Sequence, residues 1–207
     1  MPNLVLPTEI DVIQELGSGR RSHAYLANYL GKKVSVKVYK PAYIEKYQSQ
    51  YKVNIGEFEF ARNKIAYESS ALTKFVAEPY RLLSPGQGYD LALVQEYVDG
   101  IWLEELMEQS AGLPSEVLRA GYYIVEQAAK VGLYDLDISP GNIRLIKNAR
   151  DEWMPKLYDF NLMPQYICPP NPFMAIGFKL GLRSKNHRDY RSLKRWDYLA
   201  KMASKRT

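Results

Sequence analysis

The feature that most restricts the fold is a run of short apolar segments near the start of the chain, IDVIQELGSGRRSHAYLANYLGKKVSVKVYK, which begins at Ile10. A strand leads into Gly17, where a glycine turn begins, and a second strand runs through Tyr25. A turn at Gly31 and Lys32 then leads into VSVKVYK, whose strict alternation of apolar and polar residues is typical of a strand. The first part of the chain is therefore predicted to be rich in sheet.

The part of the chain between residues 55 and 98 extends this prediction. The segment from Ile55 to about Ser69, IGEFEFARNKIAYES, is rich in helix-forming residues and predicts one helix. Two apolar stretches, YRLLS and LALVQEYV, flank a Pro-Gly-Gln-Gly turn at residues 85–88, which indicates a hairpin.

The second half of the chain is predicted to be mainly helical. The segments GIWLEELMEQSA and PSEVLRAGYYIVEQAAKVG predict two helices, and a hairpin is expected through residues 147–155. In the longer helix one face is formed by Leu118, Tyr122, Val125 and Ala129. The order of elements predicts an α+β protein with a small sheet-rich part followed by a larger helical part.

Composition narrows the class of protein. The 207 residues suffice for one large domain or two small lobes with a real core. A single cysteine, Cys168, excludes an intramolecular disulfide and suits a reducing compartment. No window approaches the roughly 20 apolar residues of a membrane-spanning helix, and the start of the chain lacks the pattern of a signal peptide. We therefore expect a cytoplasmic protein.

The net charge of +5 is concentrated near the end of the chain, where residues 179–206 carry +8 and the remainder −3. Five residues of this tail lie at helical spacing: Tyr190, Leu193, Trp196, Ala200 and Ala203. The tail is either a docked helix with a solvated basic face or an interfacial helix. The second reading places the protein at the inner face of the inner membrane, where the helix contacts anionic lipid or a phosphorylated saccharide. No nucleic-acid motif accompanies the charge, so nucleic acid is not the expected partner.

Four polar pieces follow one another along the chain. The glycine turn GSGRRS spans residues 17–22, and Lys37 lies in the alternating strand. Asp137 and Asn142 bracket the turn in GLYDLDISPGNIRLI, and Asp159 ends a predicted strand in YDFN. Each piece alone is common in ordinary turns and on ordinary surfaces. Their order and separations are much less common together.

These pieces share the chemistry that a nucleoside triphosphate needs. Backbone N–H groups of a glycine turn can approach phosphate oxygens closely, and a lysine amine can reach them as a point charge. An aspartate and an asparagine supply the hard oxygen ligands that Mg²⁺ prefers. A second aspartate can accept the proton of an attacking hydroxyl group.

The arrangement resembles the protein-kinase superfamily, whose signatures are a glycine loop, a strand lysine, H-R-D-x-x-x-x-N and D-F-G. The resemblance implies binding of ATP and Mg²⁺ by a bilobal fold. It gives Asp137 the role of catalytic base and makes Asn142 and Asp159 metal ligands. The implied nucleotide-binding residues are Gly17, Gly19, Ser22, Lys37, Glu59, Glu96 and Val98. In this set the backbone of residues 96–98 pairs with adenine, and a helix glutamate pairs with Lys37. Glu59 is the preferred partner, with Glu57 and Glu68 left open.

The chain also departs from the family pattern. Ser22 replaces the third loop glycine beside Arg20 and Arg21. Asp135 and Leu136 replace the His and Arg that precede the base, and Asn161 replaces the final glycine of D-F-G. Arg144 stands where the family usually places an apolar residue under adenine.

Only 46 residues follow Asn161, and no A-P-E segment occurs among them. In this the chain resembles two groups of compact bacterial kinase-like proteins, the lipopolysaccharide core sugar kinases and the PhoP-regulatory-network (YrbL-like) family, of which the second is preferred. The resemblance implies an N-lobe at residues 1–98 and a shortened helical C-lobe at residues 99–207. It implies phosphotransfer to a hydroxyl acceptor such as a lipopolysaccharide core sugar. The alternative is a non-catalytic kinase-like regulator or nucleotide-binding protein.

Overall fold

The computed structural model describes residues 4–109, 113–160 and 164–203. The chain divides into two compact units. The first contains residues 1–64 and 77–97, and the second contains residues 65–76 and 98–207. Each unit has its own cluster of buried apolar side chains.

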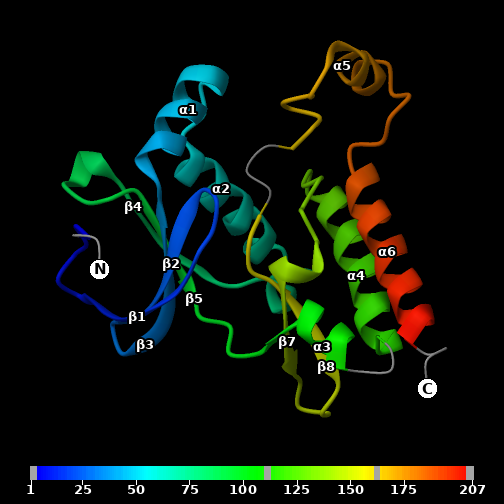
Figure 1. Ribbon diagram of the computed structural model, residues 1–207, viewed down its shortest axis with the longest axis horizontal. Helices are drawn as coiled ribbons and strands as arrows, with labels where there is room; N and C mark the ends of the chain where they lie inside the picture. Colours follow the sequence, from blue (N-terminus) through cyan, green and yellow to red (C-terminus); the bar gives the residue numbers. More distant parts are fainter. Residues whose placement is uncertain (1–3, 110–112, 161–163, 204–207) are drawn as a thin grey trace. The chain divides into compact units, whose positions relative to one another are not determined.

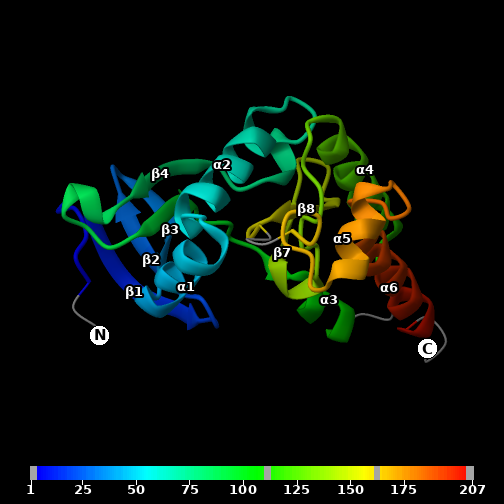
Figure 2. The same ribbon diagram turned by 90° about the horizontal axis from the view of Figure 1, so that it is seen from above.

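A five-stranded antiparallel sheet forms the first unit, and Figures 1 and 2 show it as one twisted layer. Its strands, in spatial order, are β1 (Ile10–Ser18), β2 (Ser22–Tyr29), β3 (Lys32–Tyr39), β5 (Ala92–Glu96) and β4 (Pro79–Leu83). The short 3₁₀ turn η2 (Pro85–Gln87) joins β4 to β5. The strands and the hairpin predicted from the sequence are confirmed.

The central strand β3 is buried on both of its faces. Val34, Val36 and Val38 belong to the apolar cluster on one side. The intervening side chains of Ser35, Lys37 and Tyr39 point to the other side and are buried as well. Because side chains alternate along a strand, the sequence of β3 places Ser35, Lys37 and Tyr39 on a single face.

Two helices follow β3. Helix α2 (Ile55–Glu68) matches the predicted helix, and its last turn belongs to the second unit. Helix α1 (Pro41–Tyr51) was not predicted from the sequence. Proline at its first position favours a helix start, but Tyr47 is its only fully buried residue. An apolar stripe, the main sequence signal for a helix, is therefore weak in α1.

The second unit combines a small sheet with helices. The 3₁₀ turn η1 (Thr73–Phe75) precedes it, and the antiparallel sheet consists of β6 (Ile101–Trp102), β7 (Ile143–Lys147) and β8 (Trp153–Leu157). Its helices are α3 (Leu103–Gln109), α4 (Ser115–Lys130), α5 (Pro172–Lys179) and α6 (His187–Ala203). The predicted hairpin after the polar turn is β7 and β8.

Helices α4 and α6 lie side by side (Figure 1). The buried residues of α4 are Val117, Gly121, Ile124, Val125 and Ala128. In the predicted face Val125 is buried, but Leu118, Tyr122 and Ala129 are only partly buried, so the most buried face is centred about one residue earlier. The physical reason is the partner helix: a Cβ atom at Gly121 would lie 2.6 Å from Leu193 and 2.8 Å from Trp196 of α6, so the closest approach falls on Gly121.

The region after β8 also differs from the sequence prediction. No helix was predicted between Asp159 and the basic tail, but α5 begins at Pro172. Asn171 caps this helix by accepting a hydrogen bond from Met174 N–H at 2.9 Å. The predicted tail helix is α6, in which Leu193 and Trp196 are buried; the side chains of Ala200 and Ala203 lie outside the described part. Among the described residues, no helix combines the length and apolarity needed to span a bilayer.

Candidate functional site

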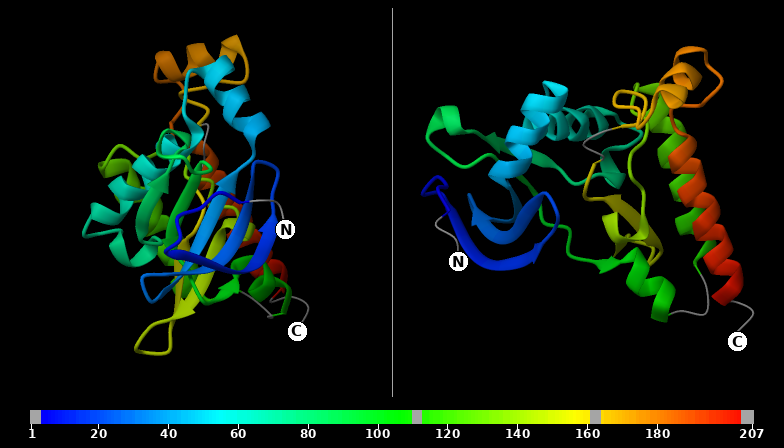
Figure 3. Two further views of the ribbon diagram at one scale, coloured as in Figure 1. Left: turned by 90° about the vertical axis from the view of Figure 1, so that its left-hand side faces the viewer. Right: turned by 45° about the horizontal axis from the view of Figure 1, so that its top comes forward.

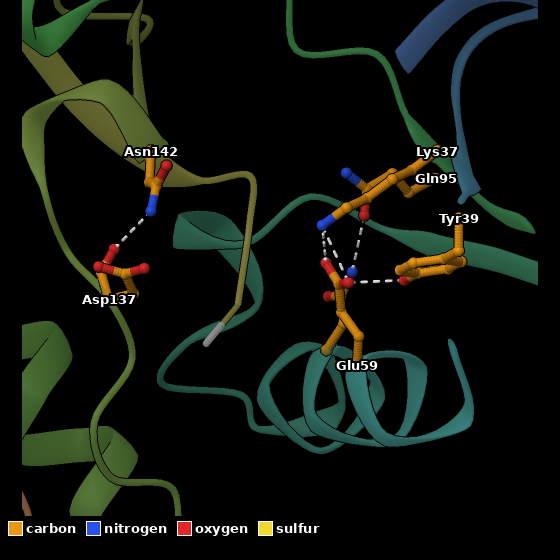
Figure 4. A network of polar contacts seen from close by, with 7 residues as sticks. Lys37, Tyr39, Glu59, Gln95, Asp137 and Asn142 are labelled. Atoms are coloured by element: carbon orange, nitrogen blue, oxygen red, sulfur yellow. Dashed lines mark hydrogen bonds and ion pairs between the residues drawn. The ribbon is translucent and has the colours of Figure 1, made fainter. Parts of the chain in front are cut away.

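Lys37 and Glu59 form a buried ion pair in the first unit (Figure 4). The Lys37 amine lies 2.7 Å and 2.9 Å from the two carboxylate oxygens of Glu59, and the Tyr39 hydroxyl donates to the same carboxylate at 2.5 Å. Only 10% of the Lys37 side chain and 1% of the Glu59 side chain are exposed. Glu57 and Glu68 are exposed, so Glu59 is the glutamate that pairs with the strand lysine.

The Lys37–Glu59 pair follows from the side-chain period of a strand and from that of a helix. Lys37 and Tyr39 are two residues apart on β3 and therefore share one face of the sheet. The buried positions of α2 include Ile55, Glu59 and Asn63, which recur every four residues and form one face of the helix. The polar face of β3 and the buried face of α2 meet at the Lys37–Glu59 pair.

A second buried contact lies beside the first. Asn63 of α2 donates its side-chain amide to the side-chain carbonyl of Gln95 at 3.1 Å, and Gln95 is paired with Ser35 in the sheet (Figure 4). This amide pair was not singled out from the sequence. The sequence did contain an indication of it: Gln95 lies within the apolar run LALVQEYV, and a buried glutamine needs a polar partner.

The glycine turn joins β1 to β2. The N–H of Gly19 donates to the carbonyl of Ser22 at 2.9 Å, which closes the turn, so this N–H is not the phosphate donor in the observed conformation. A Cβ atom at Gly17 would meet nothing within 4 Å, and one at Gly19 only the Ser22 carbonyl at 3.7 Å. Packing within the protein therefore does not require glycine at either position. Open space next to the backbone suits the close approach of a ligand.

Two side chains from the α1 region hold this turn. The Lys40 amine donates to the Gly19 carbonyl at 2.8 Å and to the Ser18 hydroxyl at 3.2 Å. Arg20 donates to the Tyr43 hydroxyl at 3.2 Å, and this hydrogen bond lowers the pKa of Tyr43. The role of Lys40 was missed from the sequence, because its partners lie 21 and 22 residues earlier in the chain.

The polar turn of the second unit contains Asp137 and Asn142 (Figure 4). Asp137 is half-buried between buried Leu136 and Ile138, and its backbone is left-handed, with φ of 63°. The 3₁₀ turn η3 (Pro140–Asn142) follows, and the Asn142 side-chain amide donates to the backbone carbonyl of Asp137 at 3.0 Å. Since the amide nitrogen is the donor, the amide oxygen of Asn142 is the atom that suits a cation.

Asp159 lies at the same end of the β7–β8 hairpin as Asn142. Ile143, the first residue of β7, pairs with Leu157, the last residue of β8. Beyond this pair the N–H of Tyr158 donates to the carbonyl of Asn142 at 3.3 Å. Asp159 therefore directly follows a residue, Tyr158, that is hydrogen-bonded to Asn142. Phe160 is buried in the apolar cluster of the unit, and Asn161 lies outside the described residues.

The donor set of this hairpin end suits Mg²⁺. Asn142 and Asp159 offer one amide and one carboxylate oxygen ligand, and Mg²⁺ typically takes one or two carboxylates and keeps phosphate and water ligands. Within the described residues, no group of three or more His, Cys, Asp or Glu side chains is placed to surround a metal ion. The set therefore fits a cation that arrives with a nucleotide.

The two residues before Asp137 have structural contacts. Asp135 is 1% exposed, accepts from Gln165 N–H at 2.7 Å and lies 3.1 Å from the Arg188 guanidinium of α6. Leu136 is buried, and its N–H donates to the Asp189 carboxylate at 2.8 Å. Helix α6 thus holds the segment that leads into Asp137. Neither Arg188 nor Asp189 was assigned this role from the sequence. The sequence feature that could have indicated it is the acidic Asp189 within a basic segment.

Arg144 contacts residues of its own unit. Its guanidinium lies 3.7 Å above the ring of Trp102, its partner across β6 and β7, and it donates to the Gly100 carbonyl at 2.6 Å. Glu96, at the end of β5, donates its N–H to the Glu78 carbonyl at 2.8 Å, so this N–H is not the adenine donor. Val98 is buried and belongs to the second unit, whereas Glu96 belongs to the first.

Comparison with known proteins identifies the fold. No protein-family model and no curated protein matches the sequence. The PknI kinase domain of Mycobacterium tuberculosis is similar in structure, with a TM-score of 0.59, 22% sequence identity, and 93% of this chain and 74% of that chain covered. A single mutant of the same domain gives a TM-score of 0.60 at 21% identity, with 93% and 73% covered. The chain therefore has the α+β fold of a protein kinase domain.

Proposed function

We propose that this protein is an ATP- and Mg²⁺-dependent phosphotransferase that acts on a hydroxyl acceptor. The observation that carries the proposal is the buried Lys37–Glu59 pair. Replacing a buried ion pair by apolar side chains of similar volume usually leaves a fold equally stable. Stability alone therefore does not explain why a protein buries such a pair. A buried charge with a specific partner is instead a common feature of functional sites.

Each polar residue has a role in this proposal. Glu59 orients the Lys37 amine, which holds phosphate oxygens together with backbone N–H groups of the turn at residues 17–22 other than that of Gly19. Asn142 and Asp159 hold Mg²⁺, which when bound would neutralise charge on the phosphate oxygens. Asp137 accepts the proton of the acceptor hydroxyl group. The adenine contacts are assigned to backbone groups of residues 96–98 other than the N–H of Glu96.

The finer assignments rest on the resemblance to compact bacterial kinase-like proteins, the PhoP-regulatory-network (YrbL-like) family and the lipopolysaccharide core sugar kinases. We propose residues 1–98 as the N-lobe and residues 99–207 as a shortened C-lobe. A lipopolysaccharide core sugar is the first acceptor to test, at the cytoplasmic face of the inner membrane. The concentration of positive charge in residues 179–206 supports an acceptor that already carries negative charge.

The most direct test is Asp137→Asn. Asparagine tolerates the left-handed backbone at this position, so the variant removes the carboxylate with little strain. We expect phosphate transfer from labelled ATP to fall by about 10²–10⁴-fold, the usual contribution of a general base. The Mg²⁺-dependent thermal shift produced by ATP is expected to remain, because Asp137 is not assigned to the nucleotide.

A matched control is Asp151→Asn in the β7–β8 turn. Asp151 also has a left-handed backbone, with φ of 61°, but its side chain is 88% exposed. Transfer should be unchanged in this variant. Equal transfer by Asp137→Asn and the parent would overturn the assignment of the base.

The second candidate function is a non-catalytic kinase-like regulator. The observation that favours it concerns Asp135, Leu136 and Arg144, which make contacts within the second unit. In the protein-kinase superfamily the residues at these three positions serve the reaction or the binding of adenine. A parent protein that ATP stabilises equally with and without Mg²⁺, and that transfers phosphate to none of the sugar, small-hydroxyl or protein acceptors, would establish this alternative.

A further inference from the structure

Helix α5 and the turn after it expose an unusual amount of apolar surface. The exposed fractions are 87% for Phe173, 53% for Ile176, 64% for Leu180 and 80% for Leu182. All eight residues of α5 are described, and none of them is fully buried. Single exposed apolar residues are ordinary, but a continuous group of large ones indicates a surface that contacts a partner. We call residues 172–183 the α5 surface.

The side chains of the α5 surface surround one hollow. A shallow cavity of about 490 Å³ lies between the helix and the following turn. Its lining residues are Asn171, Phe173, Met174, Gly177, Leu182 and Arg183. Apolar groups that face a common hollow offer room for an inserted apolar chain.

The charged residues in this part of the sequence are all basic. No aspartate or glutamate occurs between Asp159 and Asp189, whereas Lys179, Arg183, Lys185 and Arg188 fall in the same interval. Lys179 and Arg183 are exposed next to the apolar residues. Large apolar side chains bordered by lysine and arginine are characteristic of protein segments that lie in the interface of an anionic bilayer.

The base of the α5 surface is held in place within the second unit. The ring of Phe178 lies 5.7 Å from that of His187 in α6, and Arg183 N–H donates to the Gly177 carbonyl at 3.1 Å. The Lys185 amine lies over the rings of Tyr134 and Tyr166. Figures 1 and 3 show α5 beyond the N-terminal end of α6. The exposed side chains are thus presented by a supported segment.

We infer that the α5 surface docks on an anionic lipid bilayer. Phe173, Ile176 and Leu182 enter the boundary between headgroups and acyl chains, and Lys179 and Arg183 lie at the lipid phosphates. The charge selects an anionic membrane, and the apolar side chains hold the protein there. This function does not depend on phosphotransfer, so it is testable even in a protein without catalytic activity.

The test is sedimentation of the full chain with vesicles of phosphatidylcholine, with and without phosphatidylglycerol, at low and high salt. The parent should bind the anionic vesicles, and salt should weaken binding because it screens the charges. The double variant Phe173→Ser with Leu182→Ser should lower the partition coefficient by about tenfold or more, and Lys179→Gln by about fivefold. An unchanged melting temperature would show that these exposed substitutions leave the fold intact.

Matched controls are Leu30→Asn and Lys33→Gln, at exposed positions of the first unit. Asparagine suits position 30, where φ is 50°. Both controls should bind vesicles like the parent. The proposal is overturned if the parent fails to sediment with anionic vesicles or if the double serine variant binds as tightly as the parent. It is also overturned if that variant only converts a dimer into a monomer, because the α5 surface is then a contact between copies.

Insertion itself can be measured with Phe173→Trp. The introduced indole should shift its emission to the blue with anionic vesicles and be quenched by lipids brominated on the acyl chain. The parent, whose three tryptophans lie elsewhere, provides the baseline. Binding without quenching would contradict apolar insertion and leave only an electrostatic contact of the basic residues.

Discussion

The two units hold their functional residues in different ways. In the first, the Lys37 amine, the Glu59 carboxylate and the Tyr39 hydroxyl bond to one another in a buried network. In the second, Asp137 is positioned through backbone, by its left-handed φ and by contacts to the segment before it. In the first unit Lys37 and Glu59 are 22 residues apart in sequence. In the second, Asp135 and Leu136 are each 53 residues from the residue of α6 that they contact.

This difference means that the two regions depend on different forces. The first depends on charges that compensate each other away from water. The second depends on the docking of one helix, α6, whose Leu193 and Trp196 pack on α4 while its first turn bonds to the segment that leads into Asp137. Substitutions can therefore weaken either region separately.

The largest effect is expected from Lys37→Met. Removing the amine leaves the Glu59 carboxylate buried without its cation, which should lower the free energy of unfolding by about 3–5 kcal/mol in urea denaturation. Lys33→Met, on the exposed end of the same strand, should change it by less than about 0.5 kcal/mol. Adding Glu59→Leu to Lys37→Met should restore most of the loss, and no recovery would mean that the pair does not act as a unit.

Asp189→Ala tests the backbone-held region. The buried N–H of Leu136 loses its acceptor, so we expect unfolding to become easier by about 1–3 kcal/mol. Asp189→Asn keeps a side-chain oxygen at this position and should cost less. If alanine and asparagine had equal effects, the hydrogen bond would not be what anchors the segment.

Gly121→Ala probes the helix contact that supports the same region. The added methyl group would overlap Leu193 and Trp196, and such overpacking costs about 1–3 kcal/mol, offset by about 1 kcal/mol of helix propensity. A net loss of about 1 kcal/mol is expected in thermal denaturation. Gly177→Ala in α5 is the matched control with opposite sign, because its methyl group would meet only Arg183, at 3.7 Å.

The smallest effect concerns His187 in the first turn of α6. Burial lowers the pKa of His187 below its ordinary value of 6.5. The unfolded chain therefore takes up a proton before the folded one does as pH falls, so stability should decrease as the pH drops below 6.5 and level off once the folded form also titrates. In His187→Gln the melting temperature should lose this part of its pH dependence; an unchanged slope would assign it to other groups.

Much of the first unit could be predicted because its signals are local. Strand alternation placed Lys37 on a face with Tyr39, and the distance in sequence past Lys37 made Glu59 the preferred partner. Helix α1 was missed since it buries little, and α5 was missed although the Asn-Pro at residues 171–172 is a helix start signal. The anchoring role of Asp189 could not be found, because no local pattern reports a contact between residues so far apart in sequence.

The second unit shows the same limit in its packing. The periodicity of α4 gave the correct helix, but its buried face is centred one residue earlier, on Gly121. Apolar periodicity alone does not distinguish a face packed by large side chains from one that lets another helix approach closely. In α4 the position of closest approach is set by Leu193 and Trp196 of α6, which lie 72 and 75 residues after Gly121.

The left-handed backbone at Asp135 and Asp137 bears on how divergent relatives of this chain should be interpreted. Aspartate, asparagine and glycine are the residues that adopt this conformation at least cost. A lineage that had lost catalysis would still retain small polar residues at both sites. An acid preserved at position 135 therefore reports on this backbone conformation and on the contacts of Asp135 with Gln165 and Arg188. Only the carboxylate at position 137, kept in preference to asparagine, would report on chemistry.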